Sequence, residues 1–109
     1  MIQPSLTSEI GQAWLKLEQP QQAKNILAEG IGEAVPRDKV LYLAFLGRAR
    51  LLEDDLDGAV QAAGEAAEIA AGINSPRGVG FLLELRKQMP DTAIAARTLD
   101  EKLEILKTG

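Results

Sequence analysis

The sequence predicts an all-α fold made of three helical hairpins, and three observations support this prediction. Apolar residues make up 46% of the 109 residues but aromatic residues only 4%, so Ala, Leu and Ile, which suit helices, carry the apolar content. Residues of the same kind recur at an interval of 36 positions, which indicates a repeat architecture. Stretches rich in Pro, Gly and Asn lie between the repeats and are suited to loops.

Small residues mark the repeat interval. Gly11 and Gly47 are one interval apart, each follows an apolar residue, and Leu83 occupies the third step. Small residues let paired helices approach closely, and Gly30 and Ala66 fit a second such position. Lys102 departs from it, which indicates either a final helix with a solvated outer face or a third repeat that is out of register. The same interval separates three alanines, Ala23, Ala59 and Ala95.

Residues that favour helix starts divide the chain into six predicted helices. Gln19-Pro20, Asp55-Leu56 and Asp91-Thr92 lie where one helix ends and the next begins, because Asp is a favoured N-cap and Pro is tolerated at the first helical position. Two longer loops, 35–38 and 72–76, separate the repeats. The predicted helices span residues 5–18, 20–34, 38–53, 56–72, 76–89 and 92–107.

These helices are expected to form a single domain over residues 1–109, with repeats at about 4–36, 38–74 and 76–109. Three hairpins are about the minimum, because one hairpin alone exposes most of its apolar face. The first repeat begins directly after Pro4, so we expect a fragment of a longer protein whose first helix exposes an apolar face. Such a face favours self-association.

The composition argues against several classes of function. The chain has neither Cys nor His, so we expect no zinc site, no cofactor and no catalysis; an enzyme that uses carboxylates alone is the remaining enzymatic alternative. A net charge of -4 opposes binding of nucleic acid through this segment. No apolar run approaches the roughly 20 residues of a membrane span, and no signal peptide precedes the first repeat. We therefore expect a cytoplasmic protein that does not contact a membrane.

Two local motifs invite a ligand interpretation. Glu53, Asp55, Asp57 and Gly58 match the first positions of a calcium-binding EF-hand loop, but the carboxylate expected at its last position is replaced by Gly64. The repeat explains the same residues as a capped turn between helices. The glycines in 78–80 lack the third glycine and the preceding strand of a phosphate loop, so they indicate a helix start.

The apolar-Gly-x-x-aromatic pattern resembles the tetratricopeptide repeat. Ile10-Gly11-x-x-Trp14 matches that core pattern, and Leu46-Gly47 matches its first half. The resemblance implies a tetratricopeptide-like right-handed solenoid. Trp14 would then occupy a core position and not stack on a ligand, with Leu17 on the same face.

A narrower resemblance concerns the segment from Glu9 to Leu17, the middle rich in Gly and Ala, and the final segment 99–103. Together they are similar to the C-terminal repeat region of actinobacterial XRE-type helix-turn-helix transcriptional regulators. This resemblance implies the effector or oligomerisation domain of a regulator whose DNA-binding domain is not in this chain. The alternative is a free-standing tetratricopeptide adaptor that docks peptides or protein partners.

In tetratricopeptide arrays the first helix of each repeat lines the concave surface, so the resemblance also implies a ligand groove. The cations Lys16, Arg48 and Lys87 would lie on successive inner helices and could bind a carboxylate or an acidic peptide; otherwise they belong to a solvated face. The groove positions carried over are Ser8, Gln12, Leu15, Lys16, Ala44, Arg48, Leu51, Leu52, Gly80, Glu84, Lys87 and Gln88, of which the candidate groove residues are Gln12, Lys16, Arg48, Leu52, Glu84 and Lys87.

Overall fold

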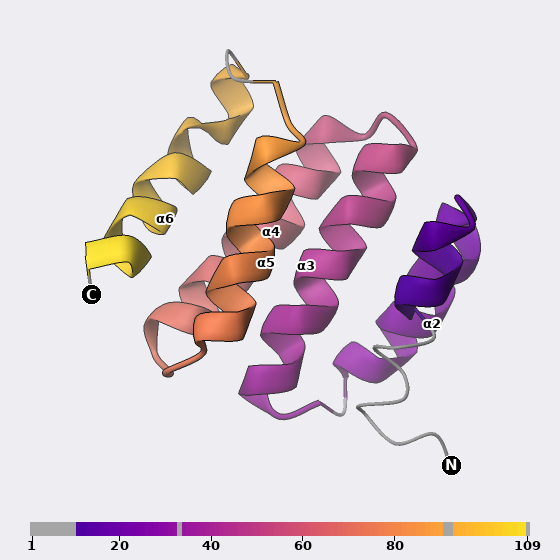
Figure 1. The fold of residues 1–109 in the computed structure, drawn as a ribbon, viewed down its shortest axis with the longest axis horizontal. Coiled ribbons are helices and arrows are strands. Elements are labelled where there is room, and N and C mark those ends of the chain that lie inside the picture. Colours follow the sequence, from indigo (N-terminus) through magenta and orange to yellow (C-terminus); the bar gives the residue numbers. More distant parts are fainter. Residues whose placement is uncertain (1–10, 33, 91–92, 109) are drawn as a thin grey trace.

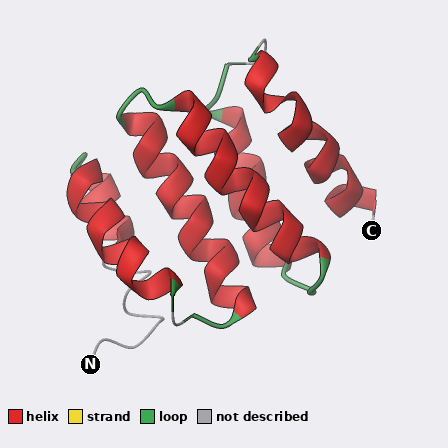
Figure 2. Cartoon of the chain, turned by 180° about the vertical axis from the view of Figure 1, so that it is seen from behind, coloured by secondary structure: helices red, strands yellow, loops and turns green. Residues whose placement is uncertain are grey.

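The computed structural model describes residues 11–32, 34–90 and 93–108, and every regular element among them is helical (Figures 1 and 2). This confirms the predicted all-α class. Successive helices run antiparallel and are joined by short connections (Figure 1). Residues 11–16 are helical, and the later elements are α2 (Pro20–Ile31), α3 (Pro36–Leu52), α4 (Leu56–Ala71), α5 (Pro76–Lys87), the 3-10 helix η1 (Ile94–Ala96) and α6 (Arg97–Thr108).

The helices form two layers, as the opposite views of Figures 1 and 2 show. We call helix 11–16, α3 and α5 the first-helix layer, because each begins a hairpin. We call α2, α4 and α6 the second-helix layer. The shortest extent of the Cα trace is 18 Å, as expected for two layers of packed helices. Of the helices in the described residues, none is long and apolar enough to cross a membrane.

The turns inside the first two hairpins have the same geometry, 36 residues apart. Glu18 and Asp54 both adopt positive φ angles, 56° and 61°. The amide N–H of the next residue then reaches back five positions, from Gln19 to the Trp14 carbonyl and from Asp55 to the Arg50 carbonyl, each at 2.9 Å. These bonds satisfy carbonyl groups at the helix ends in the manner of a Schellman motif. The sequence interval is therefore also an interval of backbone structure.

Glycine permits the closest helix approach in each of these hairpins. A Cβ atom built on Gly47 would lie 2.8 Å from the Leu85 Cδ2 atom and 3.3 Å from the Ala59 carbonyl oxygen. A Cβ atom on Gly11 would lie 2.7 Å from the Leu27 side chain. Both positions require a residue without a side chain, as the repeat pattern predicts.

The core consists of two adjoining clusters. One contains Leu15 and Leu27 of the first hairpin with Tyr42 of α3, and the other extends from α3 to α6. Ile31 and Phe81 pack against both clusters and so make the core continuous. Because α4 lies between neighbours on several sides, its buried positions are small: Ala59, Ala62, Ala63, Gly64, Ala66, Ala67 and Ala70.

The third hairpin departs from the repeat at the start of its second helix. Ala95 is exposed, whereas Ala96 is fully buried, so the predicted equivalence of Ala95 with Ala59 is wrong. Leu99 and Leu103 keep the interval, because they are buried like Ala63 and Ala67, while the Lys102 ammonium reaches back over Gly64 and pairs with Glu68 of α4 at 2.7 Å. The irregularity at Lys102 is thus a local replacement of a buried alanine and not a shift of register of the whole helix. The lysine faces α4 and does not simply point to solvent.

Helix boundaries follow the prediction with local differences. The predicted helix 92–107 begins only at Arg97, after the 3-10 helix, and residues 91–92 lie outside the described residues. The predicted helix 20–34 ends at Ile31, where a turn follows. The predicted helix 38–53 begins two residues earlier, because Pro36 occupies its first position. The part of the first predicted helix before Gly11 lies outside the described residues.

Candidate functional site

Charge separates between the two helix layers. The first-helix layer carries eight cations and two anions, although the whole chain is acidic. The second-helix layer carries four cations and seven anions. Positive charge is therefore concentrated on the helices of the first-helix layer, although the protein is acidic, and this favours approach of a negatively charged partner to that layer. Its cations are Lys16, Arg37, Lys39, Arg48, Arg50, Arg77, Arg86 and Lys87, and its anions are Asp38 and Glu84.

Three of these cations form contacts that stabilise the fold. The Arg50 guanidinium donates to the Gly58 carbonyl at 3.0 Å and fastens the turn between α3 and α4. Arg86 binds Asp100 of α6, and Lys87 forms an ion pair with Glu84 at 3.3 Å. The other five form no ion pair with any described residue: Lys16, Arg37, Lys39, Arg48 and Arg77.

A shallow depression between α3 and α5 brings part of the predicted groove together. Arg48 and Glu84 line it with Gln88, and the rings of Phe45 and Phe81 form its apolar wall. Its volume of about 40 Å³ holds one water molecule or the tip of one side chain. The depression is therefore part of a binding surface and not an enclosed site for a small molecule.

The two aromatic rings fix the geometry of this surface. Phe45 and Phe81 pack edge to face, with their ring centroids 4.9 Å apart and their planes at 70°. The Arg77 guanidinium lies over the Phe81 ring, 5.6 Å from its centroid, in a cation–π contact. Arg77 and Arg48 thus present two guanidinium groups beside one aromatic pair.

The predicted groove residues do not all lie together in the structure. Arg48 and Glu84 meet at the depression, and Lys87 is exposed and joins this pair only through its contact with Glu84. Leu52 is 43% exposed at the C-terminal end of α3. Gln12 and Lys16 lie on helix 11–16, the first member of the same layer, and the described contacts do not join them to the depression.

Several sequence expectations for the first-helix layer need correction. Leu15, carried over as a groove position, is only 2% exposed and packs in the core, and Ala44 is also buried. Trp14 packs against the core cluster, as expected. Leu17 does not share that environment, because it lies in the turn after helix 11–16 and is 65% exposed.

Two residues that the sequence reasoning missed could have been found from the repeat. Phe45 and Phe81 are separated by 36 residues, the repeat interval itself. An aromatic residue that recurs at equivalent positions of neighbouring helices predicts a contact between those helices. Arg77 had no comparable signal, because its role depends on the position of the Phe81 ring.

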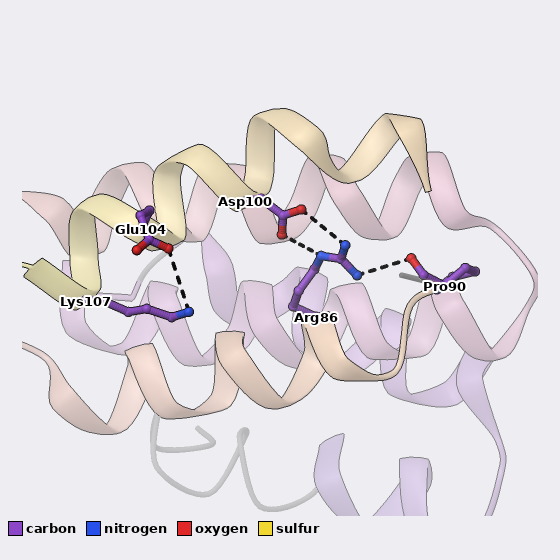
Figure 3. Close-up of polar contacts among 5 residues, drawn as sticks. All are labelled: Arg86, Pro90, Asp100, Glu104 and Lys107. Atoms are coloured by element: carbon purple, nitrogen blue, oxygen red, sulfur yellow. Dashed lines mark hydrogen bonds and ion pairs between the residues drawn. The ribbon is translucent and has the colours of Figure 1, made fainter. Parts of the chain in front are cut away.

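An ion pair between α5 and α6 anchors the last helix to this layer (Figure 3). The Arg86 Nε and Nη2 atoms donate to the two carboxylate oxygens of Asp100 at 2.7 and 3.2 Å, and Nη1 donates to the Pro90 carbonyl at 3.3 Å. The hydrogen bond from Arg86 lowers the pKa of Asp100 below its usual value, while partial burial opposes the shift.

The acidic turn that resembled a calcium loop has a structural role. The Asp55 carboxylate accepts a hydrogen bond from the Gly58 amide at 2.9 Å and caps α4. Among the described residues, no group of three or more acidic side chains is placed to hold a metal ion. Ser75 caps α5 in the same way, by accepting from the Gly78 amide.

Comparison with known proteins gives no neighbour for this chain. No family model matches its sequence, and no curated protein or solved structure shows significant similarity.

Proposed function

We propose that the chain is a tetratricopeptide-like module that binds a protein or peptide segment on the face of its first-helix layer. The repeated turn geometry at Glu18 and Asp54 supports the repeat reading. Further support comes from the close approach at Gly11 and Gly47, because glycine recurs there at the same interval. On this reading the helices form a right-handed solenoid whose concave surface is the first-helix layer.

The observation that carries the proposal is the environment of Arg48. Its side chain is half-buried, lines the depression between α3 and α5, and forms no ion pair with a described residue. A guanidinium that is partly removed from water interacts more strongly with an added carboxylate than a fully solvated one does. Arg48 is therefore suited to recognise a carboxylate in two-point contact.

The neighbours of Arg48 define the chemistry of the segment. Phe81, which is half-buried, offers an apolar wall backed by the buried Phe45, and Arg77 adds a second guanidinium over the Phe81 ring. An acidic segment that also carries an apolar side chain complements both features. Lys16, further along the layer, extends the same charge preference.

The resemblance to the repeat region of XRE-type regulators suggests where such a module works. We propose that it is the effector or oligomerisation domain of a transcriptional regulator, which binds DNA through a helix-turn-helix domain outside this chain. The net charge of -4 agrees with a segment that does not itself bind DNA. A free-standing adaptor would use the same face, and the presence or absence of a basic helix-turn-helix segment in the complete open reading frame distinguishes the two.

Fluorescence anisotropy with an acidic peptide tests the proposed binding face. The probe is a labelled peptide of about twelve residues, rich in Glu and Asp with one Phe, and Arg48→Glu is expected to weaken its binding about tenfold or more. Arg97→Glu is the matched control, because Arg97 is exposed on α6 in the second-helix layer. Equal affinities of wild type and Arg48→Glu for the probe would contradict the proposal.

A further inference from the structure

The third hairpin is more open than the second. Gly47 lets α3 approach the backbone of α4, but the position 36 residues later is Leu83, whose side chain cannot fit such a contact. The following helix, α6, accordingly packs more extensively on α4 than on α5. A groove of about 790 Å³ lies between the first half of α5, the C-terminal end of α6 and the turn that joins α4 to α5.

This groove is mainly apolar. Ile73, Val79, Leu83 and Leu106 line it and are half-buried, and Ile105 lines its rim with 64% of its surface exposed. The only charged residue in the lining is Lys107. The groove therefore offers mainly apolar contacts to a molecule that binds it.

The preceding repeat shows what covers the equivalent surface. Pro76, Gly80 and Leu83 lie 36 residues after Val40, Ala44 and Gly47 of α3. Those three α3 positions are buried beside α5: Gly78 lies close to Val40, Leu85 lies close to Gly47, and Ala44 is only 3% exposed. The repeat therefore predicts that the equivalent positions of α5 are also covered by a helix. Pro76, Gly80 and Leu83 border the groove, and no described helix covers them.

We propose that this groove binds an amphipathic helix of a partner protein, which lies against α5 as α5 lies against α3. The model for its apolar stripe is α5 itself, which buries Gly78, Leu82 and Leu85 at positions i, i+4 and i+7. The single lining cation, Lys107, selects a helix with an acidic residue at the corresponding end. The proposal goes beyond the acidic-segment site, because the groove uses none of the residues of the Arg48 depression.

The groove is less suited to a small molecule. Its volume is within the range of small-ligand sites, but such sites carry several polar groups directed at the ligand. Here the Ser75 hydroxyl already accepts a hydrogen bond from the Gly78 amide as the cap of α5. The Lys107 ammonium lies 3.9 Å from a Glu104 carboxylate oxygen (Figure 3).

A synthetic helix tests the proposal. The probe is a labelled amphipathic peptide of about fifteen residues with Leu at i, i+4 and i+7 and one Glu, titrated against the full chain by anisotropy. Ile105→Glu is expected to weaken its binding about tenfold or more, because it places a charge at the apolar rim. Ile94→Glu is the matched control: Ile94 is 79% exposed in η1 and does not line the groove. Both positions are exposed, so both variants are expected to fold.

A charge exchange adds a second, independent readout. Lys107→Glu is expected to weaken binding of the peptide. A peptide with Lys in place of its Glu is expected to regain affinity for that variant. Arg48→Glu is expected to leave the affinity of this peptide unchanged, which separates this test from that of the acidic-segment site.

Four results would overturn the proposal. The first is the absence of saturable binding to the wild type, and the second is equal weakening by the two isoleucine variants. The third is binding of decanoate, but not of the peptide, with amide NMR shifts at Val79 and Leu83. The fourth is a dimer of the chain alone that Ile105→Glu dissociates in sedimentation, which would identify a second copy as the occupant.

Discussion

At the scale of single residues, the glycines of this chain differ in what they do. Gly47 is required by contact, since a Cβ atom there would meet both the Leu85 side chain and the Ala59 backbone. Gly80 lies exposed in the interior of α5, and a Cβ atom there would meet nothing within 4 Å. The repeat pattern predicted a close contact at Gly47, and the packing adds that the space around Gly80 is open.

Alanine substitution at these two glycines should therefore have opposite effects. Gly80→Ala should stabilise the protein by about 0.5–1 kcal/mol, because alanine has the higher helix propensity. Gly47→Ala should destabilise it by about 1–3 kcal/mol through overpacking. Urea denaturation of both variants measures the free energy of unfolding, and a loss of stability in Gly80→Ala would contradict the contact geometry.

Asp54 carries a second prediction at this scale, because its φ angle of 61° is one that glycine adopts more easily. Asp54→Gly should raise the free energy of unfolding by about 0.5 kcal/mol, as relief of the left-handed backbone outweighs the greater freedom of the unfolded chain. Asp57→Gly is the control. Asp57 lies in the first turn of α4, so this substitution should lower the free energy of unfolding. Thermal unfolding of both variants distinguishes a local backbone effect from a general effect of charge removal.

At the scale of elements, the repeat interval predicted most of the fold. It located the hairpins because Gly, Ala and turn residues recur where helices must approach or end. It failed in the third hairpin, where Leu83 replaces the glycine and Ala96, not Ala95, enters the core. A bulky residue at a contact position moves the start of the following segment, so that Ala96 enters the core in place of Ala95, while Leu99 and Leu103 keep the interval. That adjustment depends on three-dimensional packing and cannot be predicted from the 36-residue interval.

The ion pair that joins α5 to α6 gives a prediction with a defined pH dependence. The pKa of Asp100 is lowered in the folded protein, mainly by Arg86, so its contribution to stability exists above the unfolded pKa of about 3.9 and is lost as the pH falls through the folded value. Asp100→Asn should therefore cost about 0.5 kcal/mol near pH 7, a small value because the carboxylate is half exposed and screened by solvent.

Urea denaturation near neutral pH and at successively lower pH, until Asp100 is protonated in the folded protein as well, tests this dependence. The difference between wild type and Asp100→Asn should vanish in acid. The control is Glu101→Gln. Glu101 lies in the same turn of α6 as Asp100, and its carboxylate forms no ion pair with a described residue. A stability difference that persists unchanged in acid would show that the asparagine acts through packing and not through charge.

At the scale of the whole molecule, the separation of charge between layers explains how an acidic chain can present a positive face. The sequence predicted the cations Lys16, Arg48 and Lys87 as members of one face, and the helices do place them in one layer. It could not predict which cations remain available, because Lys87 forms an ion pair with Glu84, whereas Arg48, which lines the same depression as Glu84, forms none with a described residue. The pairing depends on side-chain positions that the interval does not fix.

Self-association, expected from the sequence, stays a prediction at this scale. Large apolar side chains remain exposed at the connections and on α6, among them Leu17 at 65% and Val35 at 59%. Leu17 follows helix 11–16, the helix from which we expect self-association, and exposed apolar side chains of this size favour such contacts. We expect a sedimentation coefficient that rises with protein concentration.

Leu17→Ser should shift the protein toward the monomer, whereas Val35→Ser, a comparable loss of exposed apolar surface at the connection between α2 and α3, should not. Both substitutions remove a similar amount of exposed apolar surface, so a general change in solubility would affect both alike. A wild-type protein that remains monomeric at about millimolar concentration would contradict the prediction, since even weak association of Kd about 1 mM would then be visible.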